Sequence, residues 1–231
     1  MISKGELHKT QSAILYTLQY ATRARYSELQ HAAHMESDVF KFHVRKLRRV
    51  GYIVKADDGL YELTAEGKAL ASRLDKQTGR EIEQPKSSML MVVRCGDLVL
   101  GHCRNREPFN GFWGIASAPV LRGVPVAESA QRELKKQTGI DAVFRVAGSY
   151  RVIDTNRSGV VYEDKIFAVL VADINSPTKP HAWSGGHSEW MDVPTLLSKH
   201  KIFPTTDATL RMIARGETFR EDVCVYSGHE Y

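Results

Sequence analysis

The chain contains 231 residues, of which 42% are hydrophobic and 26% are charged, and its formal charge is +5 at pH 7. This length and apolar content suffice for two small domains or one large one. The chain has no apolar run of about 18 residues and its first residues form no apolar leader, so we expect neither membrane spanning nor secretion. The positive charge favours an acidic partner.

The three cysteines are Cys95, Cys103 and Cys224, and no pair of them has Cys-x-x-Cys spacing. An odd number of cysteines without such a pair fits a reducing compartment and argues against a zinc site or a disulfide framework. We therefore expect a cytoplasmic protein with free thiols.

Apolar side chains recur at helical spacing over three segments near the start of the chain, residues 11–21, 26–33 and 36–50. This pattern predicts three successive helices. Ser27 is placed to cap the second helix, and Gly51 is placed to end the third.

One side of the third predicted helix is apolar and the other is basic, carrying Lys41, Arg45, Lys46, Arg48 and Arg49. Two short strands follow at residues 52–55 and 60–63, joined by an Asp-Gly turn, and a closing helix is predicted at residues 64–74. Within this unit, His-Val-Arg-Lys-Leu-Arg-Arg-Val-Gly-Tyr-Ile-Val at 43–54 and Tyr-Glu-Leu-Thr-Ala-Glu-Gly at 61–67 resemble ArsR/MarR-type winged helix-turn-helix regulators of bacteria. The likeness covers roughly residues 6–75.

This resemblance implies that the third helix enters the major groove of double-stranded DNA. The side chains expected to reach base edges are Ser37, Asp38, Lys41, Phe42 and Arg45. Those expected to pair with phosphates are Arg48, Arg49 and Lys55, together with Arg23 and Arg25. Asp57 and Asp58 at the wing tip oppose strong contact with a minor groove. A solvated basic face, or a module for protein docking or dimerisation, is the alternative interpretation.

The character of the sequence changes after residue 75. Residues 76–87 are polar and contain Gly and Pro, which predicts a linker between a first domain at 1–75 and a second at 88–231. Beyond the linker, strand-like stretches at residues 89–94, 98–104, 142–146, 149–153 and 165–173 surround a helical segment at 123–140. These elements predict a mixed sheet sandwiched by helices.

The helical segment carries Arg132, Glu133, Leu134, Gly139 and Ile140 at the spacing of the Nudix box, G-x5-E-x7-R-E-U-x-E-E-x-G-U, where U is aliphatic. The positions of the opening glycine and of the other three glutamates hold Ala118, Val124, Lys136 and Gln137. The frame of the box is therefore similar to the family pattern, whereas its carboxylates are reduced to Glu133.

Positions 133, 136 and 137 share one face of a helix, where three carboxylates would hold Mg²⁺ or Mn²⁺ against a pyrophosphate. Lys136 instead places an ammonium beside Glu133, which predicts a weak ion pair at i, i+3. We therefore expect no metal site, no catalytic residue and no Nudix-type hydrolysis. Seen alone, the segment is also compatible with an ordinary amphipathic helix.

The Nudix resemblance extends over residues 88–216. Residues 105–115 are similar to the family's lead-in, residues 189–197 to its late strand and helix, and residues 206–214 to its closing helix. Ala-Ser-Ala at 116–118 replaces the usual Pro-Gly-Gly turn, so the loop there is expected to be reshaped. The implied fold class is α+β, a winged helix-turn-helix followed by a Nudix-like α/β/α sandwich, with the tail 217–231 as an extra strand or a partner contact.

Some bacterial regulators combine a Nudix-like domain with a winged helix and respond to ADP-ribose or sugar metabolites, although there the winged helix comes second. The resemblance thus implies a small-molecule effector, a nucleotide or sugar phosphate. Its candidate contacts are Arg104 and Arg106 for phosphate, Phe109 and Trp113 for base stacking, Tyr150 and Arg151 on a strand, and Glu163 and Asp164 for hydroxyls. Each has a plain structural alternative, such as a core position for Trp113. No cofactor is expected, since His181 and His187 lack a third ligand at usable spacing.

The combined interpretation is a DNA-binding transcriptional regulator, acting as a homodimer, whose non-catalytic second domain senses the effector. Two other classes stay open. One is a working hydrolase of nucleoside diphosphate derivatives with an accessory winged helix, its metal site rebuilt from Glu133 and acids such as Glu128, Glu163, Asp164 or Glu189. The other is a protein-interaction scaffold.

Overall fold

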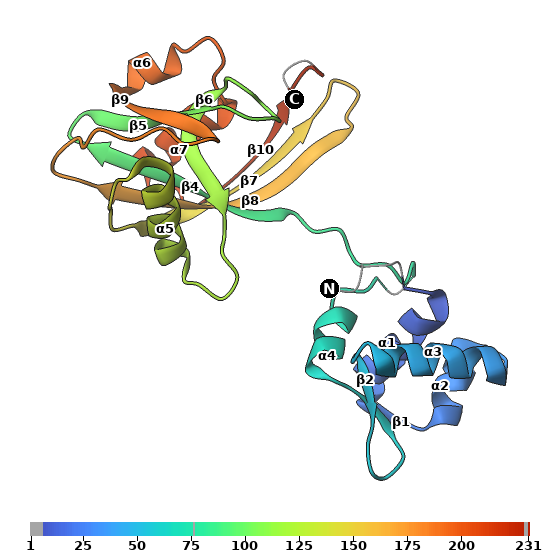
Figure 1. Ribbon diagram of the computed structural model, residues 1–231. Coiled ribbons are helices and arrows are strands. Elements are labelled where there is room, and N and C mark those ends of the chain that lie inside the picture. Colours follow the sequence, from blue (N-terminus) through green and yellow to red (C-terminus); the bar gives the residue numbers. More distant parts are fainter. Residues whose placement is uncertain (1–6, 76, 229–230) are drawn as a thin grey trace. The chain divides into compact units, whose positions relative to one another are not determined.

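The computed structural model describes residues 7–75, 77–228 and 231 (Figure 1). The chain divides into two compact units, Met1–Glu83 and Gln84–Tyr231, each with its own core. The division falls inside the predicted linker, which is shorter than expected. The Ile82 N–H donates to the Arg73 carbonyl at 2.7 Å, and Leu74 bridges to Glu81. Part of this polar stretch therefore pairs with the first unit, an interaction that composition does not reveal.

The described residues of the first unit form four helices and three short strands. In chain order they are α1 (Lys9–Ala21), β1 (Arg23–Ala24), α2 (Tyr26–Ala33), α3 (Ser37–Arg49), β2 (Ile53–Lys55), β3 (Tyr61–Leu63) and α4 (Ala65–Ala71). The strands form an antiparallel sheet in the order β1-β3-β2. The predicted helices and hairpin are present with ends shifted by a few residues, while the two-residue β1 was not predicted.

The ends of these helices have identifiable causes. Gly51, with φ +79°, follows α3 as predicted. The predicted cap at Ser27 is wrong, because α2 already begins at Tyr26 and the Glu28 carboxylate accepts from the Arg25 N–H at 2.6 Å. Gly67 permits a close crossing, since a Cβ there would lie 1.9 Å from the Tyr52 carbonyl oxygen.

The core of the first unit is built from one face of each helix. Ile14 and Leu15 of α1, Leu29 of α2, and Phe40 and Leu47 of α3 are fully buried together. Burial of this face of α3 fixes its other face toward the surface.

The second unit is a seven-stranded mixed sheet with helices on both faces (Figure 1). Its elements are β4 (Lys86–Cys95), β5 (Leu98–Arg104), β6 (Trp113–Pro119), α5 (Val126–Thr138), β7 (Arg145–Thr155), β8 (Val161–Asp173), β9 (Gly186–Asp192), α6 (Val193–Leu197), α7 (Pro204–Arg215) and β10 (Phe219–Val225). The strand order is β10-β7-β8-β4-β6-β5-β9. The β4–β8 and β7–β10 pairs are parallel, and the other pairs are antiparallel.

Alternate residues of the central strand β4 point into two cores. Met89 and Met91 pack with Leu134 of α5, whereas Leu90 and Val92 share a core with Met212 of α7. The two helices therefore lie on opposite faces of the sheet.

The structure differs from the predicted strands at β7 and settles the role of the tail at β10. The segments 142–146 and 149–153 were predicted as separate strands, yet β7 is one strand with an irregularity between Val146 and Gly148. A Cβ at Gly148 would lie 2.6 Å from the Thr218 carbonyl oxygen, so this glycine is required for close packing rather than for a turn. The tail supplies the extra strand β10, and residues 229–230 lie outside the described part. None of the described helices has the length and apolarity needed to cross a membrane.

Candidate functional site

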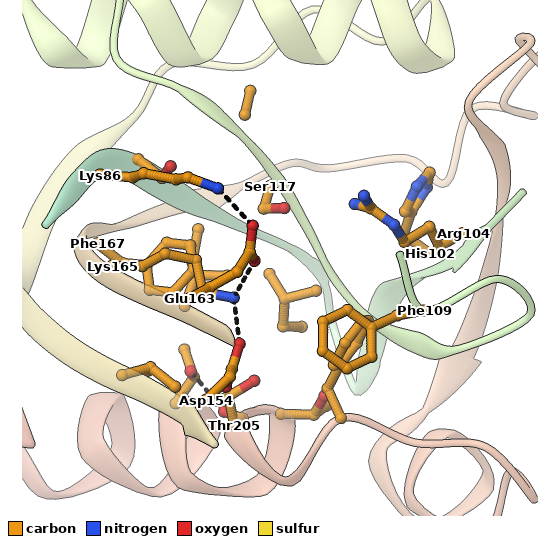
Figure 2. A pocket seen from close by; sticks show the side chains of 18 of the residues that line it. Lys86, His102, Arg104, Phe109, Ser117, Asp154, Glu163, Lys165, Phe167 and Thr205 are labelled. Carbon is orange, nitrogen blue, oxygen red and sulfur yellow. Dashed lines mark hydrogen bonds and ion pairs between the residues drawn. The ribbon is translucent and has the colours of Figure 1, made fainter. Parts of the chain in front are cut away.

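A cavity of about 330 Å³ lies in the second unit, between the sheet and the first turns of α7 (Figure 2). One part of its wall is apolar, formed by residues that include Leu90, Phe109, Ile115, Val152, Phe167, Phe203 and Tyr226. The other part carries charged and polar side chains, among them Lys86, His102, Arg104, Arg106, Ser117, Asp154, Glu163, Lys165, Thr205 and Thr206. Such a mixture of apolar surface and converging polar groups is typical of small-molecule sites.

Four charged side chains form a chain of ion pairs along this cavity (Figure 2). Lys86 Nζ donates to Glu163 at 2.6 Å, Lys165 Nζ donates to Glu163 at 2.8 Å, and Lys165 also pairs with Asp154. The sheet register brings them together, because Lys86 is directly opposite Lys165 and Asp154 is directly opposite Glu163.

The two carboxylates of this chain differ in their surroundings. Asp154 is only 2% exposed, and burial raises the pKa of its carboxyl although Lys165 opposes the shift. Burial also disfavours ionisation of Glu163, but hydrogen bonds from Lys165 and Lys86 outweigh it and lower the pKa of that carboxyl. The cavity thus holds a firmly ionised Glu163 beside a desolvated Asp154.

The rim of the cavity is basic. The Arg104 guanidinium donates to the Arg106 carbonyl at 3.1 Å and also to the Pro108 carbonyl, so this side chain holds the loop after β5. Arg106 lies over the Trp183 ring, 5.6 Å from its centroid. Burial, with nearby cationic side chains, lowers the pKa of His102 to about 4, and its ring is therefore neutral at pH 7.

The structure brings half of the predicted effector contacts to this cavity. Arg104, Arg106, Phe109 and Glu163 line it, whereas Trp113, Tyr150, Arg151 and Asp164 do not. Arg151 and Asp164 pair with each other at 2.9 Å. Each is adjacent on its strand to a residue that lines the cavity, so its side chain lies on the opposite face of the sheet.

The remaining two aromatic predictions also fall elsewhere. Tyr150 is fully buried and its hydroxyl donates to Asp222 at 2.6 Å. Trp113 lies under Lys199, whose Nζ is 4.1 Å from the ring centroid. Each ring therefore has a structural role outside the cavity.

Sequence reasoning missed Lys86, His102, Asp154 and Lys165, which all line the cavity. Lys86 fell within the predicted linker. Lys165 stands two positions after Glu163, a strand spacing that could have identified it as lying on the same face. His102 lies within a predicted strand and Asp154 directly follows another, and their convergence depends on strand order that local sequence does not contain.

The box helix α5 shows the predicted ion pair. Lys136 Nζ lies 3.7 Å from Glu133 Oε1, and the Glu133 side chain is 15% exposed. Gln137 is buried, and its Nε2 donates to the Ser117 carbonyl at 3.4 Å. An ammonium, an amide and one carboxylate do not fit a divalent cation, which prefers several oxygen ligands. In the described residues, no group of three His, Cys, Asp or Glu side chains could hold a metal ion.

The first unit presents a second candidate surface, the outer face of α3. Eight of the ten predicted DNA contacts lie on α3 and β2, and all eight are exposed: Ser37, Asp38, Lys41, Phe42, Arg45, Arg48, Arg49 and Lys55. Within the part of the chain that the structure describes, none of the α3 cations Lys41, Arg45, Lys46, Arg48 and Arg49 forms an ion pair. Arg23 differs, since it pairs with Asp58 at 2.9 Å and with Glu62 at 3.3 Å. The side chain predicted to contact phosphate at Arg23 is therefore already paired with two acids of the β2–β3 hairpin in this structure.

No protein-family model matches the chain, and no curated protein matches it. Similarity appears among solved structures. The Nudix domain of Shewanella oneidensis NrtR, solved with ADP ribose, is 13% identical, with a TM-score of 0.51 over 66% of this chain and 99% of that one. The MutT Nudix hydrolase of Burkholderia pseudomallei is 22% identical, with a TM-score of 0.48 over 56% of this chain and 98% of that one. The similarity to the Shewanella domain shows that the chain contains a Nudix-like fold.

Proposed function

We propose that this protein, which contains a Nudix-like fold, is a DNA-binding transcriptional regulator. In this proposal α3 serves as the recognition helix of a winged helix-turn-helix, and β2 and β3 form the wing. The observation that carries the proposal is the basic face of α3, whose cations are free of ion pairs among the described residues and are complementary to a polyanion. A major groove is wide enough to admit such a helix.

The cavity of the second unit is the proposed effector site. Its described lining includes the cations Lys86, Arg104, Arg106 and Lys165 but only the two acids Asp154 and Glu163, a balance that favours an anionic ligand. The aromatic part of the wall suits a base or sugar ring. A nucleotide or sugar phosphate meets both requirements, and ADP-ribose, the ligand named for the Shewanella domain, is the first compound to test.

Binding without hydrolysis is the second part of the proposal. Lys136 neutralises Glu133 where a metal ion would be needed, so the box helix supplies the frame of the fold but no cation site. The effector acts by favouring one arrangement of a homodimer, because a ligand with equal affinity for two states shifts neither. In such a dimer, two recognition helices about 34 Å apart meet successive major grooves.

The proposal divides the α3 side chains into two groups with different effects on DNA binding. Lys41→Ala is expected to relax sequence preference, because Lys41 lies near the N-terminal half of α3 where base edges are read. Arg49→Ala is expected to weaken all duplexes similarly and to reduce the slope of log affinity against log salt by about one. Titration of labelled duplexes at several salt concentrations measures both effects, and equal loss of preference in both variants contradicts the division.

Two further results would overturn the proposal itself. Undetectable binding to mixed genomic duplexes at about 50 mM salt would favour the protein-interaction scaffold, since the electrostatic part of binding is strongest at low salt. Mg²⁺-dependent turnover of ADP-ribose that disappears in Glu133→Gln would favour the hydrolase. Mass spectrometry of small molecules that copurify with the full chain, followed by thermal shift with the compound found, identifies the effector.

A further inference from the structure

Two apolar side chains stand exposed among the charges of α3. Phe42 is 60% exposed and Val39 is 48% exposed. They are three positions apart and therefore adjacent on the helix surface. The Phe42 ring meets the ring of His43, its neighbour on the same helix, edge to face, with centroids 5.4 Å apart and planes at 77°.

The charges around this pair limit what can cover it. Asp38 lies one turn before Phe42, and Arg45, Lys46 and Arg49 lie one to two turns after it, all exposed. An apolar protein groove would have to desolvate these cations, which is costly without paired acids. A polyanion that presents small apolar groups between its charges fits this pattern of cations and apolar side chains.

In duplex DNA the small apolar group exposed in the major groove is the C5 methyl group of thymine. We infer that Phe42 and Val39 contact thymine methyl groups, so that α3 selects target sites partly by apolar contact. This inference rests on the proposed DNA-binding function and extends it, since Val39 becomes a specificity residue and the target must contain thymine where Phe42 meets the groove.

The test replaces methyl groups one at a time. The full chain first selects a binding site from a pool of random duplexes, and each thymine of that site is then replaced by uracil, which removes only the methyl group. At one or two positions the replacement is expected to weaken binding about fourfold, the factor that corresponds to ~0.8 kcal/mol for one buried carbon group. Phe42→Ala is expected to bind the thymine site more weakly and to lose this sensitivity.

Arg49→Ala is the matched control, because removing a side chain that pairs with a phosphate weakens thymine and uracil sites equally. Phe42 is exposed, so its substitution is expected to leave the melting temperature unchanged, and a thermal melt verifies this. A selected site that tolerates uracil at every position overturns the inference, as does unchanged methyl sensitivity in Phe42→Ala. DNA binding without any selected sequence also overturns it, whereas absence of DNA binding at low salt overturns the proposed function as well.

Discussion

The helices α3 and α5 are alike in length and in their number of charged side chains, six and five, but differ in the balance of sign and in how the cations are paired. Each has 13 residues, and each is followed by a glycine with positive φ. On α5 every cation is paired: Arg132 with Glu128, Lys135 with Asp141 and Lys136 with Glu133. On α3 the only acid is Asp38, and its cations lack ion-pair partners among the described residues.

The number of charged side chains on a helix therefore does not decide whether it can bind an external anion. An exposed ion pair is weak, but it still removes most of the net field that a polyanion would meet. The α3 cations keep that field, whereas Lys136 of α5 lies 3.7 Å from Glu133, the one carboxylate that the box retains, and offsets part of its charge. Changing the charge of one helix at a time separates the effect of net charge from that of ion pairing.

The largest effect is expected from reversing charge on α3. Arg45→Glu combined with Arg49→Glu is expected to lower DNA affinity at least about a hundredfold, because like charges brought against phosphates cost several kcal/mol and each 1.4 kcal/mol is a factor of ten. The matched control is Arg132→Glu with Lys135→Glu on α5, which changes the net charge equally. Equal reductions of affinity in a duplex-binding titration would show that net charge, rather than the α3 surface, drives binding.

The second experiment restores the carboxylates of the box. Lys136→Glu with Gln137→Glu places three carboxylates on one face of α5 and buries one of them, so the double variant is expected to melt at a lower temperature than the wild type without metal. Mg²⁺ at about 100 times its dissociation constant is expected to raise the free energy of unfolding of the double variant by about 2.7 kcal/mol. Lys135→Glu is the control, because the Lys135 side chain is exposed and a carboxylate there would not join the other three. A double variant that melts at the same temperature with and without Mg²⁺ would mean that the helix frame does not present the carboxylates to one ion.

Much of this fold could be predicted because its signals are local. The apolar periods of α3 and α5 and the glycines that follow them identified both helices to within a few residues. Failures occurred where long-range packing decides the outcome. Gly148 resembles a strand break but lies inside β7, and β1 is too short to show any period.

Only half of the predicted effector contacts line the cavity, because its lining also depends on long-range packing. Glu163 and Asp164 were both proposed as contacts, yet adjacent residues of a strand face opposite sides and only Glu163 lines the cavity. The partners of Glu163 come from β4 and from its own strand, and the match of Lys86 with Lys165 depends on a parallel register between distant segments. Such a register is not contained in either segment alone.

A smaller effect, on the pH dependence of stability, is expected from His43 on the buried face of α3. Burial lowers the pKa of His43, with help from His8, stacked at 4.3 Å, and from Lys46. As pH falls below about 6.5 the unfolded chain binds a proton before the folded one, so stability is fully present above that pH and declines below it. The free energy of unfolding is expected to fall by at most about 1.4 kcal/mol for each pH unit.

Hydrogen exchange of the α3 amides between pH 7 and pH 5, corrected for the intrinsic rate, measures this decline in the full chain. His43→Gln is expected to remove the slope whatever its effect on absolute stability. An unchanged slope in that variant would assign the titration to another group.

The smallest effect is expected on the outer face of α5. Arg132→Ala removes an exposed i, i+4 pair with Glu128, and such pairs contribute about 0.3 to 0.5 kcal/mol. The melting temperature should therefore fall only slightly, and affinity for DNA should stay unchanged, since this cation is already paired within its own helix. Arg48→Ala on α3 is the counterpart: it breaks no ion pair among the described residues, so stability should hold while DNA affinity falls. If Arg132→Ala instead weakened DNA binding as much as Arg48→Ala, pairing would not be what separates the two helices.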